Sequence, residues 1–396
     1  MAVQVWYDVG SRHEPKGGTG FAHLFEHLMF QGSANVGPGE HFAAIQGVGG
    51  TFNGTTSFDR TNYFETVPVH ALELALWLEA DRMATLLEAV TQDNLDNQRD
   101  VVKNERRQRF DNQPYGTAWE RVFALLYPAG HPYHHLPIGS MEDLDAASVE
   151  DIHEFFRRFY GPDNAVIAVV GDVDPDSTVA LVDQYFAGIS ASGQDTTAPD
   201  GTIGPLDAPE HVVIDEVVPN SALYHAYRVP PDGTADADAL EVAFEVLTGG
   251  GASRLVERFV RGEQLARSLG GGPQGLVGGT SVAALITHLR AGTETDRIVS
   301  GIDDEIARLA QHGPADDELE RARARLERHW LAQVETVMGR AGQLCQYEVL
   351  HGGAAHLLEV LPRLQAVTGD EVMAAVARWL VPDNRVTVEY RPEAVA

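Results

Sequence analysis

The chain has 396 residues, more than one compact core usually holds, so we expect two domains. Apolar residues make up 44% and charged residues 22%, a balance typical of a folded rather than a disordered protein. The net charge of −29 repels phosphate backbones and anionic lipids, which argues against nucleic acids and membranes as partners.

The first residues, MAVQVWYDVG, alternate apolar and polar side chains as a strand does, and no signal peptide is recognisable. A cytoplasmic location is therefore the expectation. The single cysteine, Cys345, excludes an internal disulfide and a thiolate-rich metal site. Any metal ion must be bound by histidine and carboxylate side chains.

The segment GFAHLFEHLMF, which starts at Gly20, carries three ionisable residues in an otherwise apolar pattern. His23, Glu26 and His27 lie at positions i, i+3 and i+4, so a helix places them on one face. Two imidazoles one turn apart can bind the same metal ion, and a glutamate beside them can take a proton from bound water. A pair of structural histidines is the alternative, but it leaves three ionisable groups poorly paired in an apolar helix.

The segments TFNGTTSF and TNYFETVP flank Asp59-Arg60 and predict a hairpin, and helical patterns follow over 69–89, 92–110 and 141–160. Zinc bound by two histidines needs a third protein ligand and an open position. Glu105 in VVKNERRQ is the best candidate, yet spacing alone does not favour it over Glu79 or Glu88. Its basic neighbours also suit a solvated helix face.

Prolines flank the histidines of GHPYHHLPIG, which therefore predicts a loop at a pocket rim or on the surface. The histidines of this segment are His131, His134 and His135.

The chain contains an internal repeat. FYGPDNAVIAVVGD and WLVPDNRVTVEYRP share a helix end, a Pro-Asp-Asn turn and an apolar strand, and nearly the same offset aligns the opening strand with ALYHAYRVP. We infer two halves, 1–189 and 211–396, joined by a linker over 190–210 that is rich in Gly, Ser, Thr, Pro and Asp. Strands beside segregated helices predict an α+β fold in each half.

In the second copy of the histidine motif, Val242 and Val246 replace both histidines, and Glu245 keeps the glutamate. We therefore expect one metal ion per chain. The second half also has an extra strand, HVVIDEVV, without a counterpart in the first half. Either the sequence starts one strand inside a longer product, which leaves a periplasmic or secreted location open, or the first sheet has an unusual edge.

With GTGFAHLFEHLMFQGS, GGTFNGTTSFDRTNYFETVP, VVKNERRQ and the duplication, the chain resembles the pitrilysin/insulinase family of zinc metallopeptidases, whose motif is H-x-x-E-H. The likeness spans essentially the whole chain and is strongest to short bacterial and mitochondrial-processing-type members. It implies that His23, His27 and Glu105 bind one zinc ion and that Glu26 is the general base. It also implies two homologous, mostly antiparallel halves that close like a clamshell around short or unfolded peptides.

The resemblance points to the strand with Asn53 and Gly54 as the edge on which an extended peptide pairs, although this dipeptide also suits a turn or bulge. It points to Arg340 and Tyr347 of GRAGQLCQY as groups that hold the substrate carbonyl; they lie seven positions apart, on one helix face. Many members carry a glutamate seven residues before the third ligand. Gln98 stands there in this chain, which leaves its zinc affinity open.

The sequence thus predicts a zinc-dependent endopeptidase that uses zinc-activated water. The alternative is a non-catalytic or partner-dependent subunit of a heterodimeric peptidase of the same family. In either case we expect a dimer, formed with a second copy or with a paralogous chain.

Overall fold

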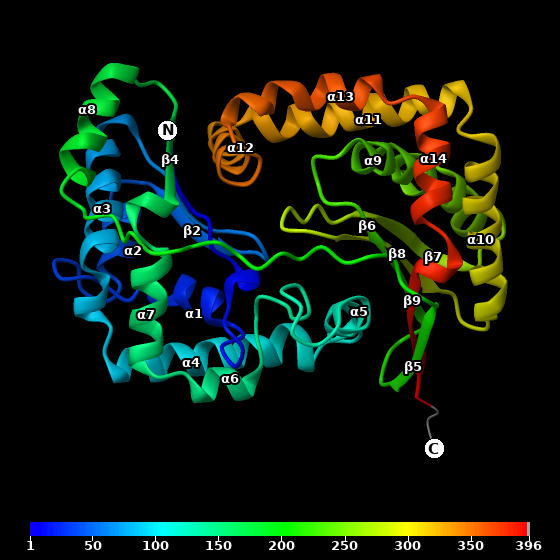
Figure 1. Cartoon of the computed structure of the whole chain (residues 1–396), viewed down its shortest axis with the longest axis horizontal. Coiled ribbons are helices and arrows are strands. Elements are labelled where there is room, and N and C mark those ends of the chain that lie inside the picture. Colours follow the sequence, from blue (N-terminus) through cyan, green and yellow to red (C-terminus); the bar gives the residue numbers. More distant parts are fainter. Residues whose placement is uncertain (394–396) are drawn as a thin grey trace. The chain divides into compact units, whose positions relative to one another are not determined.

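The computed structural model describes residues 1–393 and contains two compact units, each with its own sheet (Figure 1). Unit 1 is formed by Met1–Arg107, His135–Pro199 and Ala332–Leu357, and unit 2 by Gln108–His134, Asp200–Leu331 and the residues from Leu358 onward. Within residues 1–393, no helix combines the length and the apolar character needed to cross a lipid bilayer.

The strands of unit 1 are β1 (Ala2–Tyr7), β2 (Thr51–Thr56), β3 (Thr61–Thr66) and β4 (Ala165–Val170). Its helices are α1 (Phe21–Leu28), α2 (Glu40–Gly47), α3 (Leu72–Ala89), α4 (Gln92–Arg106), α6 (Met141–Ala146), α7 (Val149–Phe159), α8 (Pro175–Phe186) and α12 (Val337–Leu350). The strands of unit 2 are β5 (Glu210–Glu216), β6 (Ala222–Val229), β7 (Ala266–Pro273), β8 (Ser281–Leu289) and β9 (Arg385–Pro392). Its helices are α5 (Ala118–Leu126), α9 (Ala235–Thr248), α10 (Thr295–His312), most of α11 (Asp316–Glu335), α13 (Val360–Ala366) and α14 (Gly369–Trp379).

Apart from β5, the two sheets share one topology. The order is β2-β3-β1-β4 in unit 1, with all neighbours antiparallel, and β5-β9-β6-β8-β7 in unit 2, where only β5 and β9 are parallel. These sheets and their covering helices confirm the predicted α+β fold, the duplication and the hairpin across Asp59-Arg60. The structure shows no counterpart of β5 in unit 1 within residues 1–393, so β4 is an edge strand while β9 is enclosed.

Different helices cover the two faces of the unit 1 sheet, because successive side chains of a strand point to opposite sides. On one face Phe25 of α1 stacks on Tyr160, which packs against Tyr7 of β1. On the other face the Nε2 atom of Gln4 donates to the backbone oxygen of Met338 in α12 at 2.8 Å. The sheet therefore lies between α1 and α12.

The compact units differ in composition from the two sequence halves. The second half contributes α12, which packs on β1 and β4 of unit 1, and the first half contributes α5, which packs on β6 and β9 of unit 2. The two helices hold equivalent positions in the repeat, as do the strands that they cover. An amphipathic helix can bury its apolar face on either sheet, and the local sequence does not say on which.

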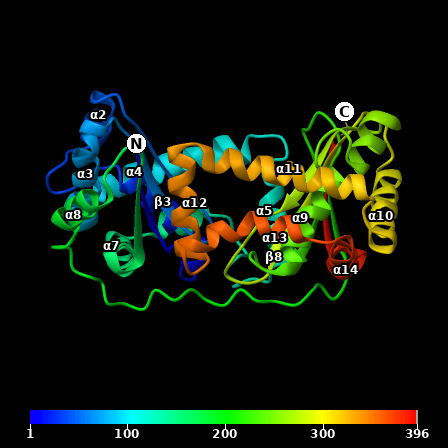
Figure 2. The same ribbon diagram turned by 90° about the horizontal axis from the view of Figure 1, so that it is seen from above.

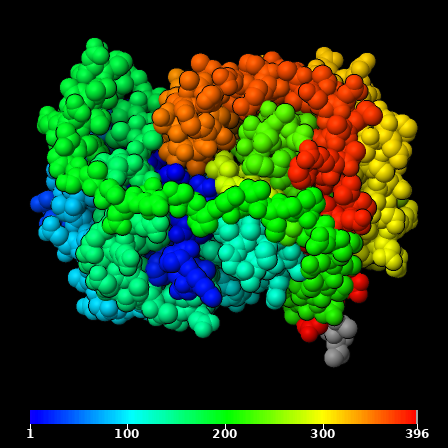
Figure 3. All heavy atoms as spheres, viewed as in Figure 1, coloured from blue at the N-terminus to red at the C-terminus, as the bar shows by residue number. Residues whose placement is uncertain are grey.

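The linker between the halves lies on the surface. Residues 190–209 contain no helix and no strand, and the segment is drawn as an extended green chain in Figure 2. The space-filling view shows much of it at the surface (Figure 3), although Gly201 is buried. This finding agrees with its Gly, Ser, Thr, Pro and Asp content.

Candidate metal centre

The motif H-x-x-E-H forms the amphipathic helix α1. Phe21, Leu24, Phe25 and Leu28 are buried on one side, whereas the three ionisable side chains lie half-buried on the other. Apolar packing thus fixes the rotation of the helix about its axis and decides which face carries His23, Glu26 and His27.

Glu105, near the end of α4, meets both histidines. Its Oε2 atom lies 3.6 Å from Nε2 of His23 and 3.3 Å from Nε2 of His27, and the two imidazole centroids are 4.9 Å apart. These nitrogen–oxygen distances exceed that of an ordinary hydrogen bond, about 2.9 Å. The three side chains are therefore directed at a common point and are too far apart for ordinary hydrogen bonds between them.

This donor set fits zinc. Two imidazole nitrogens and one carboxylate oxygen are a common protein ligand set, and neighbouring donors around a tetrahedral zinc ion lie about 3.4 Å apart. The separations of 3.3 and 3.6 Å agree with that value. The side chains are between 12% and 22% exposed, which leaves the site accessible to a solvent or substrate oxygen.

Glu79 and Glu88, the other candidates for the third ligand, lie elsewhere. Glu79 belongs to a second group of metal-ligand types, with His41 and Glu65, which is fully buried. Arg82 binds Glu79 with two nitrogens and lies 4.0 Å from Glu65, so this group already contains its own cation. Glu88 is exposed at the far end of α3.

Glu26 lies between α1 and the edge strand β2. Its Oε2 atom accepts a hydrogen bond from the hydroxyl of Thr56 at 2.7 Å. Burial raises the pKa of Glu26, while the Thr56 hydrogen bond and the nearby His27 oppose that shift. A raised pKa makes a carboxylate a better proton acceptor near neutral pH. Thr56 carried no signal of its own in the sequence.

β2 pairs with β3 alone and is the edge of its sheet. A Cβ atom at Gly54 would lie 3.0 Å from Cγ of Glu26, so the glycine lets the helix approach the strand. Asn53 points to the other face, is exposed, and its Oδ1 accepts the N–H of Gly54 at 2.9 Å. This N–H donates to a side chain and not to β3, so it faces the open edge.

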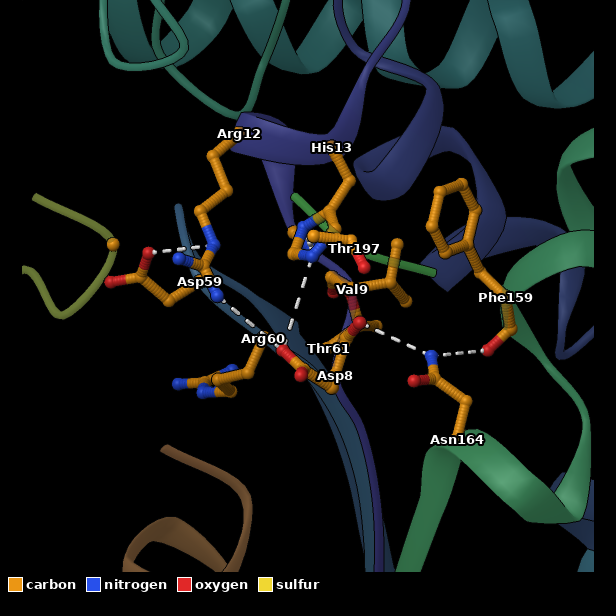
Figure 4. A network of polar contacts seen from close by, with 12 residues as sticks. Asp8, Val9, Arg12, His13, Asp59, Arg60, Thr61, Phe159, Asn164 and Thr197 are labelled. Carbon is orange, nitrogen blue, oxygen red and sulfur yellow. Dashed lines mark hydrogen bonds and ion pairs between the residues drawn. The ribbon is translucent and has the colours of Figure 1, made fainter. Parts of the chain in front are cut away.

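A polar network ties the connection between β1 and α1 to the β2–β3 hairpin, as Figure 4 shows. Arg12 lies 3.2 Å from Asp59 in the hairpin turn, and the hydroxyl of Thr61 donates to the backbone oxygen of Val9 at 2.8 Å. A Cβ atom at Gly10 would lie only 2.4 Å from the backbone of the hairpin, so the two segments are in close contact. These contacts hold the hairpin that carries Thr56 against the connection that leads into α1.

The structure places Arg340 and Tyr347 on α12, across the sheet from α1 and within the same unit as the metal ligands. Arg340 is exposed, and its Nε atom donates to the backbone oxygen of Val334 at 3.4 Å. Tyr347 is buried and stacks on His351. Gln98 is also buried, in α4, and its Nε2 atom donates to Asn97 at 2.8 Å.

The copy of the motif in unit 2 is built differently. Val242 and Val246 are buried on α9, and Glu245 binds Nε of Arg325 in α11 at 2.6 Å. His329 of the same helix lies 3.8 Å from the other oxygen of Glu245. An ion pair thus occupies the place that the donor set has in unit 1.

Comparisons with known families assign the two copies of the motif to different family models. Residues 1–130 match the family described as insulinase (peptidase family M16), and residues 146–326 match the peptidase M16 inactive domain. The donors of α1 and α4 lie in the first range, and the copy with valines lies in the second.

Individual relatives are also described as proteases. The zinc protease PqqE of Helicobacter pylori is 34% identical over 268 residues, which span 67% of this chain but only 60% of that protein. An uncharacterised zinc protease of Mycobacterium leprae is 29% identical over 391 residues, 96% of this chain and 84% of that protein. The crystal structure of a protease from Helicobacter pylori matches with a TM-score of 0.92 at 27% identity, covering 99% of this chain and 94% of that one.

Proposed function

We propose, on the premise that the chain belongs to the insulinase (M16) family of peptidases, that it is a zinc-dependent endopeptidase that hydrolyses short or unfolded peptides. One observation carries the proposal. His23, His27 and Glu105 direct three suitable donors at one point, beside a carboxylate held in place by Thr56. A helix with only a structural role does not need these ionisable side chains on one face.

In this proposal Glu26 is the general base. Zinc, when bound by the three donors, lowers the pKa of water and polarises a carbonyl group. Glu26 takes the proton of the attacking water and passes it to the leaving amine. Its raised pKa suits both transfers, and the hydrogen bond from Thr56 fixes the carboxylate against β2.

The substrate would add to the sheet at β2 as an extended strand. Such pairing uses main-chain hydrogen bonds and so tolerates many sequences. The N–H of Gly54 faces this edge, and the side chain of Asn53 covers it in the free protein. A peptide carbonyl would displace the Asn53 oxygen and place the scissile bond beside Glu26.

Arg340 and Tyr347 would approach the same peptide from the other side of β2. Both lie on α12, which covers the sheet face opposite α1. A guanidinium and a phenol directed at the developing oxyanion stabilise the transition state. Their role requires Arg340 to leave the backbone oxygen of Val334 that it now contacts.

The test is hydrolysis of a quenched, unstructured peptide by the wild type and by two matched variants. Glu26→Gln keeps the three donors and removes the base, so we expect a loss of about 10²- to 10⁴-fold in kcat with zinc still bound. Glu245→Gln makes the same change in the copy and should retain full activity.

If Glu26→Gln cleaves like the wild type, the hydrolysis comes from elsewhere and the assignment fails. If the purified wild type is inactive alone but active with a paralogous chain, the chain is a partner-dependent subunit. If it stays inactive with such a chain, a non-catalytic role replaces the proposal.

A further inference from the structure

The metal-site helix α1 does not cap its own N-terminus. Its N-cap is Gly20, in the left-handed region at φ 95°, which offers no side-chain acceptor. Glu14 supplies the acceptors from outside the helix: its two carboxylate oxygens accept the N–H groups of Gly20 and Ala22 at 2.9 and 2.8 Å. This carboxylate is completely buried.

Glu14 is held in turn by the segment 135–147, which we call the brace. Nε2 of His135 lies 2.7 Å from Oε2 of Glu14. Asp143 accepts hydrogen bonds from the N–H and the hydroxyl of Thr19, just before α1, at 3.1 and 2.5 Å. A Cβ atom at Gly139 would lie 2.4 Å from Cα of Gly20, so the two backbones touch.

The brace also binds α4, the helix that carries Glu105. Arg99 donates to the backbone oxygens of Leu144 and Ala147, both at 2.6 Å. Lys103 pairs with Asp145 at 2.6 Å, and Arg106 donates to the backbone oxygen of Gly139 at 2.9 Å. The basic residues around Glu105 therefore attach α4 to the brace.

The brace thus contacts the beginning of the helix that supplies two of the donors and one face of the helix that supplies the third. We propose that residues 135–147 fix α1 against α4, and that His135 and Asp143 are positioning residues for the metal centre, acting through Glu14 and Thr19. The inference rests on the proposed function, since it takes His23, His27 and Glu105 as the zinc ligands.

A simple packing role makes a different prediction. Loops that only fill space affect overall stability when altered, whereas groups that orient metal ligands alter metal affinity, typically 10- to 100-fold when removed. Zinc affinity and the exchange of α1 amides therefore separate the two cases, and both can be measured on protein that is fully folded.

The experiment uses the whole chain with four changes. His135→Leu removes the donor to Glu14, and His135→Gln keeps an N–H that can reach it. Asp143→Asn weakens the contact with Thr19. Asp163→Asn is the control, because Asp163, in the turn after α7 in unit 1, also accepts from backbone N–H groups and a hydroxyl, and these belong to Ser192 and Gly193 and not to α1, α4 or the brace.

Zinc affinity is measured by competition with a chelator, the cobalt form by visible absorption, and amide exchange of residues 20–24 on the metal-free protein. We expect His135→Leu and Asp143→Asn to bind zinc about 10- to 100-fold more weakly, with an altered cobalt spectrum and faster exchange. His135→Gln should recover most of the affinity, and Asp163→Asn should match the wild type. kcat should fall while KM stays unchanged.

Wild-type zinc affinity and wild-type exchange in His135→Leu and Asp143→Asn would overturn the proposal. An equal loss in Asp163→Asn would do so too, because it would indicate general destabilisation. A wild type that binds zinc but hydrolyses no peptide refutes the proposed function and leaves the brace standing on the affinities; a wild type that binds no zinc refutes both.

Discussion

In α1 a glutamate lies between two histidines, and in α9 the corresponding Glu245 lies between two valines. The helices that face the two motifs, α4 in unit 1 and α11 in unit 2, differ as well. Glu105 of α4 directs a carboxylate at its motif, whereas Arg325 of α11 directs a cation at Glu245. The copy in unit 2 thus contains its own positive charge, whereas the motif in unit 1 presents three donors that can bind a metal cation. One backbone plan therefore serves metal binding or structural pairing, depending on a few side chains.

The largest difference between the two units is expected from a glycine in a strand of each sheet. Gly54→Ala adds a Cβ atom 3.0 Å from Cγ of Glu26 and should push the base out of place by a few tenths of an ångström. We expect kcat to fall about tenfold, since a misplacement of about 1 Å costs roughly 10²-fold. Gly270→Ala, in β7 of the second sheet, meets open space and should leave hydrolysis unchanged. Equal rates for the two variants would contradict the role of Gly54.

A second difference lies in the central strands. His225 of β6 stands at the position of Val5 in β1, as the registers with β9 and β4 show. It is fully buried, both ring nitrogens lack a hydrogen-bond partner among residues 1–393, and burial lowers its pKa to about 3. The unfolded state then binds more protons than the folded state between pH 6.5 and 3, so stability falls as the pH falls through that range.

His225→Val, which copies the first half, should remove this loss. Between pH 7 and pH 5 we expect the wild type to lose about 2 kcal/mol more unfolding free energy than the variant. Urea unfolding at the two pH values measures the difference. His312→Val, at an exposed position, serves as the control and should behave like the wild type. The same pH dependence in His225→Val and the wild type would show that this histidine is not buried as a neutral ring.

The smallest effect concerns the ion pair of the copy. Arg325→Gln removes the ion pair with Glu245 and leaves only His329 nearby, at 3.8 Å. It should lower the unfolding free energy of unit 2 by about 1 kcal/mol, because both side chains of the pair are partly exposed. Arg321→Gln, on the same helix and in a more exposed pair, should cost less. Peptide hydrolysis by both variants should match the wild type. A loss of activity in Arg325→Gln would show that the copy takes part in catalysis.

Local pattern was enough to predict α1, because the apolar face of a short helix decides which residues share the other face. The same holds for the hairpin of β2 and β3 and for the duplication, which both depend on residues close in sequence or on similarity to another segment. The choice of Glu105 came from resemblance to a family. Only tertiary contacts exclude the alternatives, since Glu79 is bound by Arg82 inside the core.

Other features had no local signal. The exchange of α5 and α12 between the units follows from which sheet each helix covers, and the sequence of a helix does not contain that information. His135 is expected on the surface or at a pocket rim, and its side chain is 22% exposed; its pairing with Glu14, 121 positions earlier in the chain, has no local signal. Such a contact is specified by the fold as a whole.

Metal content tests the central claim most directly. The wild type and Glu105→Gln are saturated with zinc, dialysed and analysed for metal per chain under identical conditions. We predict one zinc ion per wild-type chain and a large loss in Glu105→Gln, while Glu245→Gln retains one. A wild type that keeps no zinc, or a Glu105→Gln variant that keeps it as tightly as the wild type, would contradict the metal centre described for α1 and α4.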